Sequence, residues 1–182
     1  MVRMYTVGHS SRTAGEFLSL LRAYEINLLI DVRRYPGSKR HPQFNEGDLK
    51  KSLAAATIGY RHEVLLGGRR GPPAPDNPNT GWRVMDFQAY ADHLNSGQAQ
   101  AALRQIIKIS EEQTVVLMCA EVVPWRCHRR ILADHLIARD ITVHHIIDSN
   151  QVRPHTLQQM AIITEDRTVI YPDTDQQQEL FD

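Results

Sequence analysis

Polar side chains that could do chemistry follow four short segments of this chain that are typical of strands, at residues 4–7, 28–32, 60–63 and 114–118. They are His9, Ser10, Asp31, Arg33, His62, Glu63, Cys119 and Glu121. Carboxylates and imidazoles can transfer protons, guanidinium groups can hold anions, and a thiolate can attack an electrophile. Because ligands of parallel sheets bind beyond the carboxyl ends of the strands, we expect this set to converge at one edge.

The segment 119–129 holds the most side chains that could take part in catalysis or bind an anion. Cys119 ends a strand, and Arg126 and Arg129 lie near the start of the following helix. Backbone amides, the helix dipole and these arginines would lower the pKa of the Cys119 thiol, which makes it a candidate nucleophile. In a structural interpretation, Cys119 is a small buried side chain and Cys127 only begins the helix.

A metal site is a further interpretation of the cysteines, because Cys119, Cys127, His128 and the distant His9 could supply four zinc ligands. Their spacing is not the close pair of cysteines of a zinc knuckle, so no metal is predicted. The chain has no Walker loop and no dinucleotide-binding glycine fingerprint, so no other cofactor is predicted either.

The net charge of zero hides an uneven distribution. Residues 164–182 hold six acidic side chains and one basic one out of 21 of each kind, which leaves 20 basic and 15 acidic side chains elsewhere. The excess lies in clusters at residues 33–41, 69–70 and 126–130. Such clusters are often only solvated surface. Alternatively they line a pocket for an anionic substrate, because guanidinium groups match phosphate and carboxylate geometry.

The predicted elements alternate, which indicates an α/β fold with a mainly parallel sheet. Helices are expected from about residue 14 and at 48–56, 86–95, 99–112 and 127–139, with a further strand at 142–147. Residues 66–83 are rich in glycine and proline and predict a long loop, which in a compact domain is usually functional or disordered.

Composition excludes several classes of protein. With 42% hydrophobic and 23% charged residues the chain is globular, and two cysteines make no disulfide framework. No apolar run is long enough to span a bilayer, and the first residues do not resemble a secretory signal. We therefore expect a cytoplasmic protein without a membrane partner, with one domain at 1–172 and a flexible acidic tail at 173–182.

Two segments resemble rhodanese-like domains: Leu29-Ile30-Asp31-Val32-Arg33 resembles their early strand, and the stretch from Val115-Val116-Leu117-Met118-Cys119 through Leu132 to Val143 resembles their cysteine loop and the helix after it. That resemblance implies sulfur transfer through Cys119. Glu121 departs from the rhodanese pattern, because a carboxylate two residues after the cysteine would oppose an anionic sulfur or phosphate group.

A closer resemblance covers nearly the whole chain. The motifs Thr6-Val7-Gly8-His9-Ser10, Asp31-Val32-Arg33-Arg34-Tyr35-Pro36-Gly37-Ser38, Leu66-Gly67-Gly68, and Cys119-Ala120-Glu121 with Cys127-His128-Arg129 are similar to the bacterial family called domain of unknown function 488. The resemblance implies a Rossmann-like three-layer α/β sandwich. It also implies that the signature positions are His9, Ser10, Asp31, Arg33, Pro36, Ser38, Cys119, Glu121, Cys127, His128 and Arg129.

The last residues resemble a docking peptide. Gln177, Leu180 and Phe181 match the peptide by which bacterial polymerases and repair proteins bind the DNA sliding clamp. A flexible tail could present the two apolar side chains to a pocket while the glutamine anchors it by hydrogen bonds.

Three functional hypotheses follow. The first is a small enzyme of DNA maintenance that acts on nucleic acid or a nucleotide-like anion. Its candidate catalytic residues are His9, Asp31, Cys119, Glu121 and His128, with Asp31 or Glu121 as base and His9 or His128 as acid; its candidate anion-binding residues are Ser10, Arg33, Ser38, Arg126 and Arg129. The second is a rhodanese-like sulfurtransferase that uses Cys119. The third is a non-catalytic protein that binds the clamp through its tail.

Overall fold

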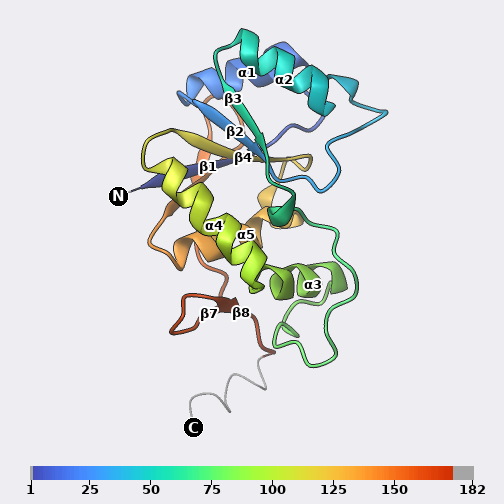
Figure 1. The fold of residues 1–182 in the computed structure, drawn as a ribbon, viewed down its shortest axis with the longest axis vertical. Helices are drawn as coiled ribbons and strands as arrows, with labels where there is room; N and C mark the ends of the chain where they lie inside the picture. Colours follow the sequence, from blue (N-terminus) through green and yellow to red (C-terminus); the bar gives the residue numbers. More distant parts are fainter. Residues whose placement is uncertain (1, 174–182) are drawn as a thin grey trace.

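A six-stranded sheet forms the centre of the molecule in the computed structural model, which describes residues 2–173 (Figure 1). In chain order its strands are β1 (Arg3–Gly8), β2 (Leu28–Asp31), β3 (Gly59–His62), β4 (Val115–Cys119), β5 (Thr142–Ile146) and β6 (Val152–Pro154). They lie in the order β3-β2-β4-β1-β5-β6, and only β6 is antiparallel to its neighbour. The mainly parallel sheet predicted from the alternating pattern is therefore confirmed.

Among residues 2–173, five α-helices cover the two faces of the sheet (Figure 1). Buried side chains of α1 (Ala14–Ala23) and α2 (Glu46–Ala55) pack on one face, and those of α3 (Met85–Leu94), α4 (Gly97–Ser110) and α5 (Arg129–Ile137) pack on the other. Side chains of a strand alternate between faces, so Val116 and Met118 of β4 join the first core while Val115 and Leu117 join the second. The molecule is thus the expected three-layer, Rossmann-like α/β sandwich.

Local sequence explains where several elements begin. Thr13 caps α1 and forms a capping box with Glu16, and Ser96 caps α4 by accepting a hydrogen bond from the Ala99 amide. All five residues of β4 are buried, as its uninterrupted apolar run predicts for a central parallel strand.

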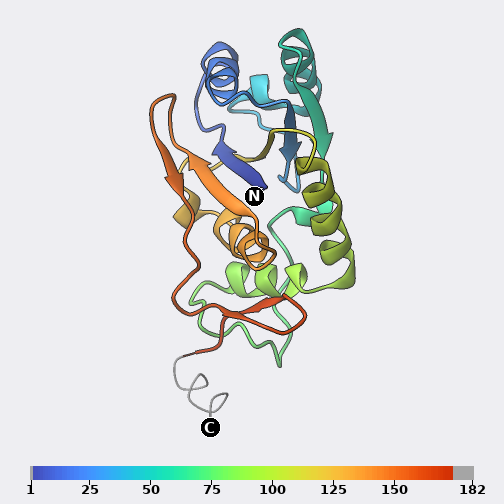
Figure 2. The same cartoon turned by 90° about the vertical axis from the view of Figure 1, so that its left-hand side faces the viewer.

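The structure adds elements that the sequence pattern does not predict. β6 pairs with β5 as a hairpin at the sheet edge (Figure 2), and β7 (Ile162–Ile163) pairs with β8 (Val169–Ile170) in a separate small ribbon. Short 3-10 turns form η1 (Pro42–Phe44), η2 (Val64–Leu66) and η3 (Pro124–Arg126). Helix α5 begins at Arg129, two residues later than predicted, because Cys127 has an extended backbone after η3 and His128 is the N-cap residue. The predicted docking peptide lies outside the described residues.

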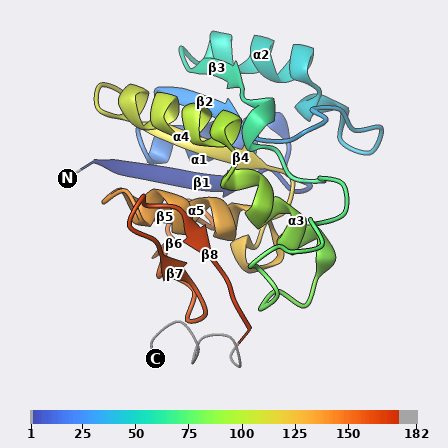
Figure 3. The same cartoon turned by 60° about the horizontal axis from the view of Figure 1, so that its bottom comes forward.

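The carboxyl ends of β1, β2 and β4 meet at one end of the sheet, close to α3 and to the segment that joins β3 to α3 (Figure 3). Gly8 of β1 pairs with Cys119 of β4, and the chain beyond Cys119 passes close over Gly8. A Cβ atom on Gly8 would lie 1.8 Å from the Glu121 carbonyl oxygen, so only glycine fits there. Within residues 2–173 no helix has both the length and the apolar character needed to span a membrane.

Candidate functional site

A cavity of about 490 Å³ lies at these strand ends. Its lining comes from the loops that leave this end of the sheet and from α3: His9, Arg33, Arg34, Tyr35, Gly37, Ser38, His41, Gly68, Arg69, Asp86, Phe87, Tyr90, Cys119, Ala120, Glu121, Arg126, Cys127 and His128. The volume is in the range of sites for small organic ligands. Four arginines against two acidic side chains make the lining basic, as the charge clusters predict for an anion pocket.

Most of the predicted site residues line this cavity. Those that do are His9, Arg33, Ser38, Cys119, Glu121, Arg126 and His128. Ser10, Asp31 and Arg129 do not line it. Ser10 instead supplies a backbone carbonyl to His9, and Asp31 and Arg129 lie buried behind the wall.

Asp31 holds Arg33 in place. Its carboxylate accepts hydrogen bonds from Nε and Nη2 of Arg33, the shortest at 2.6 Å, and another from the Tyr60 hydroxyl at 3.0 Å. Nη2 also donates to the Phe44 carbonyl oxygen at 2.8 Å. Both residues are buried, so this ion pair is well ordered. We predicted Asp31 as a general base, but its carboxylate is directed at Arg33 and Tyr60 and does not face the cavity.

His9 is a neutral imidazole beside Arg33. Its Nδ1 lies 2.8 Å from the Ser10 carbonyl oxygen, which can only accept, so the ring proton is on Nδ1. Burial lowers the pKa of His9 to about 4, and its ring stacks on Phe44 at 4.2 Å. The unprotonated Nε2 lies 3.4 Å from Nη1 of Arg33. At neutral pH His9 can therefore accept a proton, whereas the role of acid that we predicted for it requires the protonated ring.

Two thiols and an imidazole form the floor of the cavity. The His128 Nδ1 atom lies 3.9 Å from the Cys119 sulfur and 3.7 Å from the Cys127 sulfur. A hydrogen bond with Cys127 and burial raise the pKa of Cys119. Burial opposes ionisation of Cys127 as well, but the hydrogen bond from Cys119 and the nearby His128 and Arg129 leave the pKa of Cys127 well below its usual value. The pKa is thus raised at Cys119 and lowered at Cys127, whereas we predicted a lowered pKa at Cys119.

Arg129 holds the loop that carries Glu121. Its guanidinium is buried and donates to the backbone carbonyls of Glu121 and Val122, to the Thr6 hydroxyl at 3.3 Å and to the Cys127 sulfur at 3.4 Å. Because these groups occupy the guanidinium and Arg129 does not line the cavity, Arg129 is not placed to hold a ligand directly. The exposed Arg126 is at the cavity instead.

Several lining residues were not predicted as site residues. They are Arg34, Tyr35, His41, Arg69, Asp86, Phe87 and Tyr90. Arg34 donates to the Arg69 carbonyl oxygen at 2.7 Å, which joins the loop after β2 to the glycine-rich loop. The basic clusters and the long loop at 66–83 were the available signals. They did not indicate which of their residues face inward.

Comparisons with known proteins give a family but no activity. No curated protein and no solved structure matches the chain. The model of the family described as "Domain of unknown function DUF488" matches residues 13–136, which is more than half of the chain and includes most of the cavity lining. The motifs, the three-layer fold and this match agree, and the protein belongs to the DUF488 family.

Proposed function

We propose that this protein is a small enzyme that binds a phosphorylated, nucleotide-sized anion in the cavity at the carboxyl end of its sheet. The observation that carries the proposal is Arg33, which lines the cavity: Asp31 and the Phe44 carbonyl fix its guanidinium, while its Nη1 lies 3.4 Å from Nε2 of His9. A guanidinium whose orientation is fixed in advance loses little entropy when it binds an oxyanion.

Basic groups at the cavity rim support the same ligand. Arg34, Arg69 and Arg126 surround the Arg33 position, and at least two of them, Arg69 and Arg126, are exposed and free to move toward a charged group. Phe87 and Tyr90 add aromatic surface on the wall formed by α3. An oxyanion could bind the arginines while a flat ring, such as a base, contacts the aromatic side.

Proton transfer in such an enzyme would use His9, which lines the cavity and whose unprotonated Nε2 lies 3.4 Å from Nη1 of Arg33. Glu121, which with Asp86 supplies the exposed carboxylates of the lining, is the alternative base. The substrate could be a free nucleotide or the end of a nucleic acid strand, in keeping with a role in DNA maintenance.

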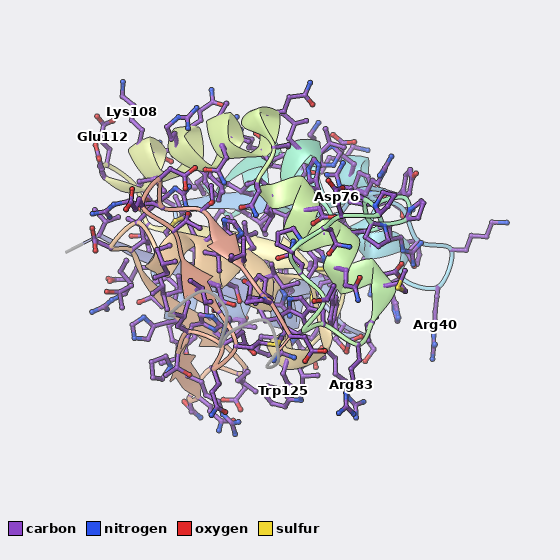
Figure 4. The ribbon with its side chains drawn as sticks, turned by 90° about the horizontal axis from the view of Figure 1, so that it is seen from below. Arg40, Asp76, Arg83, Lys108, Glu112 and Trp125 are labelled. Atoms are coloured by element: carbon purple, nitrogen blue, oxygen red, sulfur yellow. The ribbon has the colours of Figure 1, made fainter. Side chains whose placement is uncertain are left out.

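The proposal is tested by calorimetric titration with inorganic phosphate, nucleoside 5′-monophosphates and a short single strand. Arg126→Ala and Arg69→Ala each remove one rim charge and should weaken binding about tenfold, the worth of one charge-assisted hydrogen bond. Arg40→Ala is the matched control, because Arg40 lies in the loop after β2 but extends away from the protein (Figure 4). Equal affinity in all three variants, or no binding by the unaltered chain, contradicts the proposal.

Sulfur transfer through Cys119 is the alternative activity. The reversed pKa order disfavours it, since Cys119 is the thiol that stays protonated. Incubation with thiosulfate followed by mass spectrometry would reveal a persulfide on Cys119 if this alternative holds.

The tail proposal is independent of the cavity. Gln177, Leu180 and Phe181 would deliver the enzyme to DNA by binding the sliding clamp, or would be the whole function of a non-catalytic binding protein. A chain truncated before Gln177 should lose clamp binding in a pull-down and keep phosphate binding. Clamp binding by the truncated chain would refute the tail proposal.

A further inference from the structure

Three atoms that bind soft metal ions converge on the cavity floor. The sulfurs of Cys119 and Cys127 and a ring nitrogen of His128 all lie within 4.8 Å of one another. Both cysteines are buried; Cys119 is the last residue of β4, and Cys127 and His128 directly precede α5. Positions eight or nine apart in sequence are thus brought to one point by the loop that carries η3.

The separations fit a tetrahedral ion. With Zn–S near 2.3 Å and Zn–N near 2.0–2.1 Å, tetrahedral angles separate a sulfur and a nitrogen ligand by about 3.6 Å. The observed distances from Nδ1 of His128 are 3.7 Å to Cys127 and 3.9 Å to Cys119. A shift of a few tenths of an ångström would therefore bring each nitrogen–sulfur pair to the tetrahedral separation, and the two sulfurs lie within 4.8 Å of each other, against about 3.8 Å for two sulfurs on one tetrahedral zinc.

We propose that Cys119, Cys127 and His128 bind one zinc ion, with its fourth coordination position open to the cavity. Two thiolates and an imidazole are donors that favour zinc over magnesium or calcium, which prefer oxygen. The two thiolates also neutralise the charge of the ion. An otherwise basic cavity can therefore hold a dication here.

Groups around the three ligands fix them in this arrangement. Arg129 donates from Nε to the Cys127 sulfur at 3.4 Å, as outer-shell donors do to metal thiolates. Tyr90 meets the His128 ring edge-on at 4.9 Å, and Gly68 packs so closely that an added Cβ would lie 2.8 Å from Nδ1. The ring is therefore held with Nδ1 toward both sulfurs.

A purely thiol-based arrangement explains the geometry less well. An imidazole nitrogen has one lone pair and can accept from one thiol at a time, yet Nδ1 is nearly equidistant from the two sulfurs. The other ring nitrogen, Nε2, is buried and contacts no hydrogen-bond partner in the described part of the chain, so no second contact accounts for the ring orientation. A shared ion satisfies all three donor atoms together.

The open position distinguishes this site from a closed structural one. Three protein ligands with a vacant fourth position are typical of catalytic zinc, where water or a substrate group completes the shell. All three ligands line the same cavity as Arg33 and Arg126. The zinc proposal does not depend on anion binding, and either can fail without the other.

The test is zinc and cobalt loading of the full chain, freed of metal by a chelator under reducing conditions. We expect one equivalent of zinc by elemental mass spectrometry. With cobalt we expect strong visible bands of a tetrahedral ion and a thiolate charge-transfer band in the near ultraviolet. Loss of the stoichiometric metal is expected in Cys119→Ser, Cys127→Ser and His128→Asn. His41→Asn is the matched control, because His41 lines the cavity away from the three ligands and should keep the ion.

Each outcome supports or overturns the site. The cobalt spectrum of the unaltered chain tests it even if a ligand variant does not fold. No metal above trace, cobalt binding without a thiolate band, or full zinc retention in Cys127→Ser would each overturn it. Rapid formation of a Cys119–Cys127 disulfide in place of metal uptake would overturn it as well and assign the pair a redox role. Arg126→Ala should lose phosphate affinity and keep zinc, which separates failure of this site from failure of the anion proposal.

Discussion

Buried Arg129 is joined to buried Asp134 by a continuous chain of hydrogen bonds. Arg129 donates to the Thr6 hydroxyl at 3.3 Å, and this hydroxyl lies 2.7 Å from Nδ1 of His145. Nε2 of His145 lies 2.9 Å from Nδ1 of His155, and Nε2 of His155 donates to the Asp134 carboxylate at 2.8 Å. Burial lowers the pKa of His145 to about 3, so its ring is neutral and has one donor and one acceptor nitrogen. The chain links a buried cation to a buried anion and leaves none of these atoms unpaired.

Thr6→Val tests this chain because it removes the hydroxyl and keeps the volume. Arg129 Nη1 and His145 Nδ1 would lose their shared partner, and we expect the free energy of unfolding to fall by about 3 kcal/mol. Thr6→Ser keeps the hydroxyl and should cost about 1 kcal/mol for the lost methyl group. Urea denaturation of both variants checks this. Equal stability of the two variants would show that the chain contributes nothing.

Gly8→Ala tests the close passage of the loop over β1. The added methyl would lie 1.8 Å from the Glu121 carbonyl, so the loop must move, at an expected cost of about 3 kcal/mol or more. Gly15→Ala in α1 is the control, because no atom lies within 4 Å of the added methyl and alanine favours helices. Chemical denaturation should separate the two variants clearly. If Gly8→Ala is as stable as Gly15→Ala, the loop does not pass where the structure places it.

Much of the site was predictable because it depends on the layout of a parallel sheet. His9, Arg33 and Cys119 end three apolar runs, and the carboxyl ends of neighbouring parallel strands must meet. The direction of each side chain was not predictable. Asp31 and Arg129 turn away from the cavity because partners distant in sequence, Tyr60 and Thr6, hold them.

The ionisation of the two cysteines also depends on tertiary contacts. The sequence places arginines near both sulfurs, and only the fold shows that Arg129 donates to Cys127 while Cys119 donates its own proton to the same atom. Tyr90 reaches the cavity because α3 packs across the end of the sheet, which no local pattern encodes. The antiparallel β6 was not predicted because three exposed residues, of which only Val152 is a strand-favouring apolar residue, carry no alternating pattern.

His135→Leu should change how stability depends on pH. Burial and Arg139 lower the pKa of His135 from 6.5 to about 3, and neither ring nitrogen has a hydrogen-bond partner among residues 2–173. The unfolded chain binds a proton below pH 6.5 and the folded chain does not, so His135 makes stability fall as pH decreases toward 3. Between pH 6.5 and 3, His135 lowers the free energy of unfolding by about 1.4 kcal/mol for each unit by which the pH falls.

Leucine in place of His135 removes this pH-dependent contribution to the free energy of unfolding and also removes the two unpaired ring nitrogens. We expect the variant to be more stable at pH 7 by about 1 kcal/mol, with a larger gain at pH 5. Denaturation at the two pH values measures both effects. A gain that is the same at both pH values would mean that the folded protein binds the proton as readily as the unfolded chain, and a gain that shrinks at pH 5 would mean that it binds the proton more readily.

Gly68→Ala should weaken the zinc site without removing a ligand. The added methyl would lie 2.8 Å from Nδ1 and 3.1 Å from Cγ of His128, so the ring must turn away from the sulfurs. Displacing the support of a ligand typically costs tenfold or more in metal affinity, and we expect about that loss in competition with a chelator. Gly71→Ala in the same loop has open space around the added methyl and should bind zinc like the unaltered chain. If the two variants bind zinc equally well, His128 is not a ligand in the orientation seen here, and the cysteines must hold the ion without it.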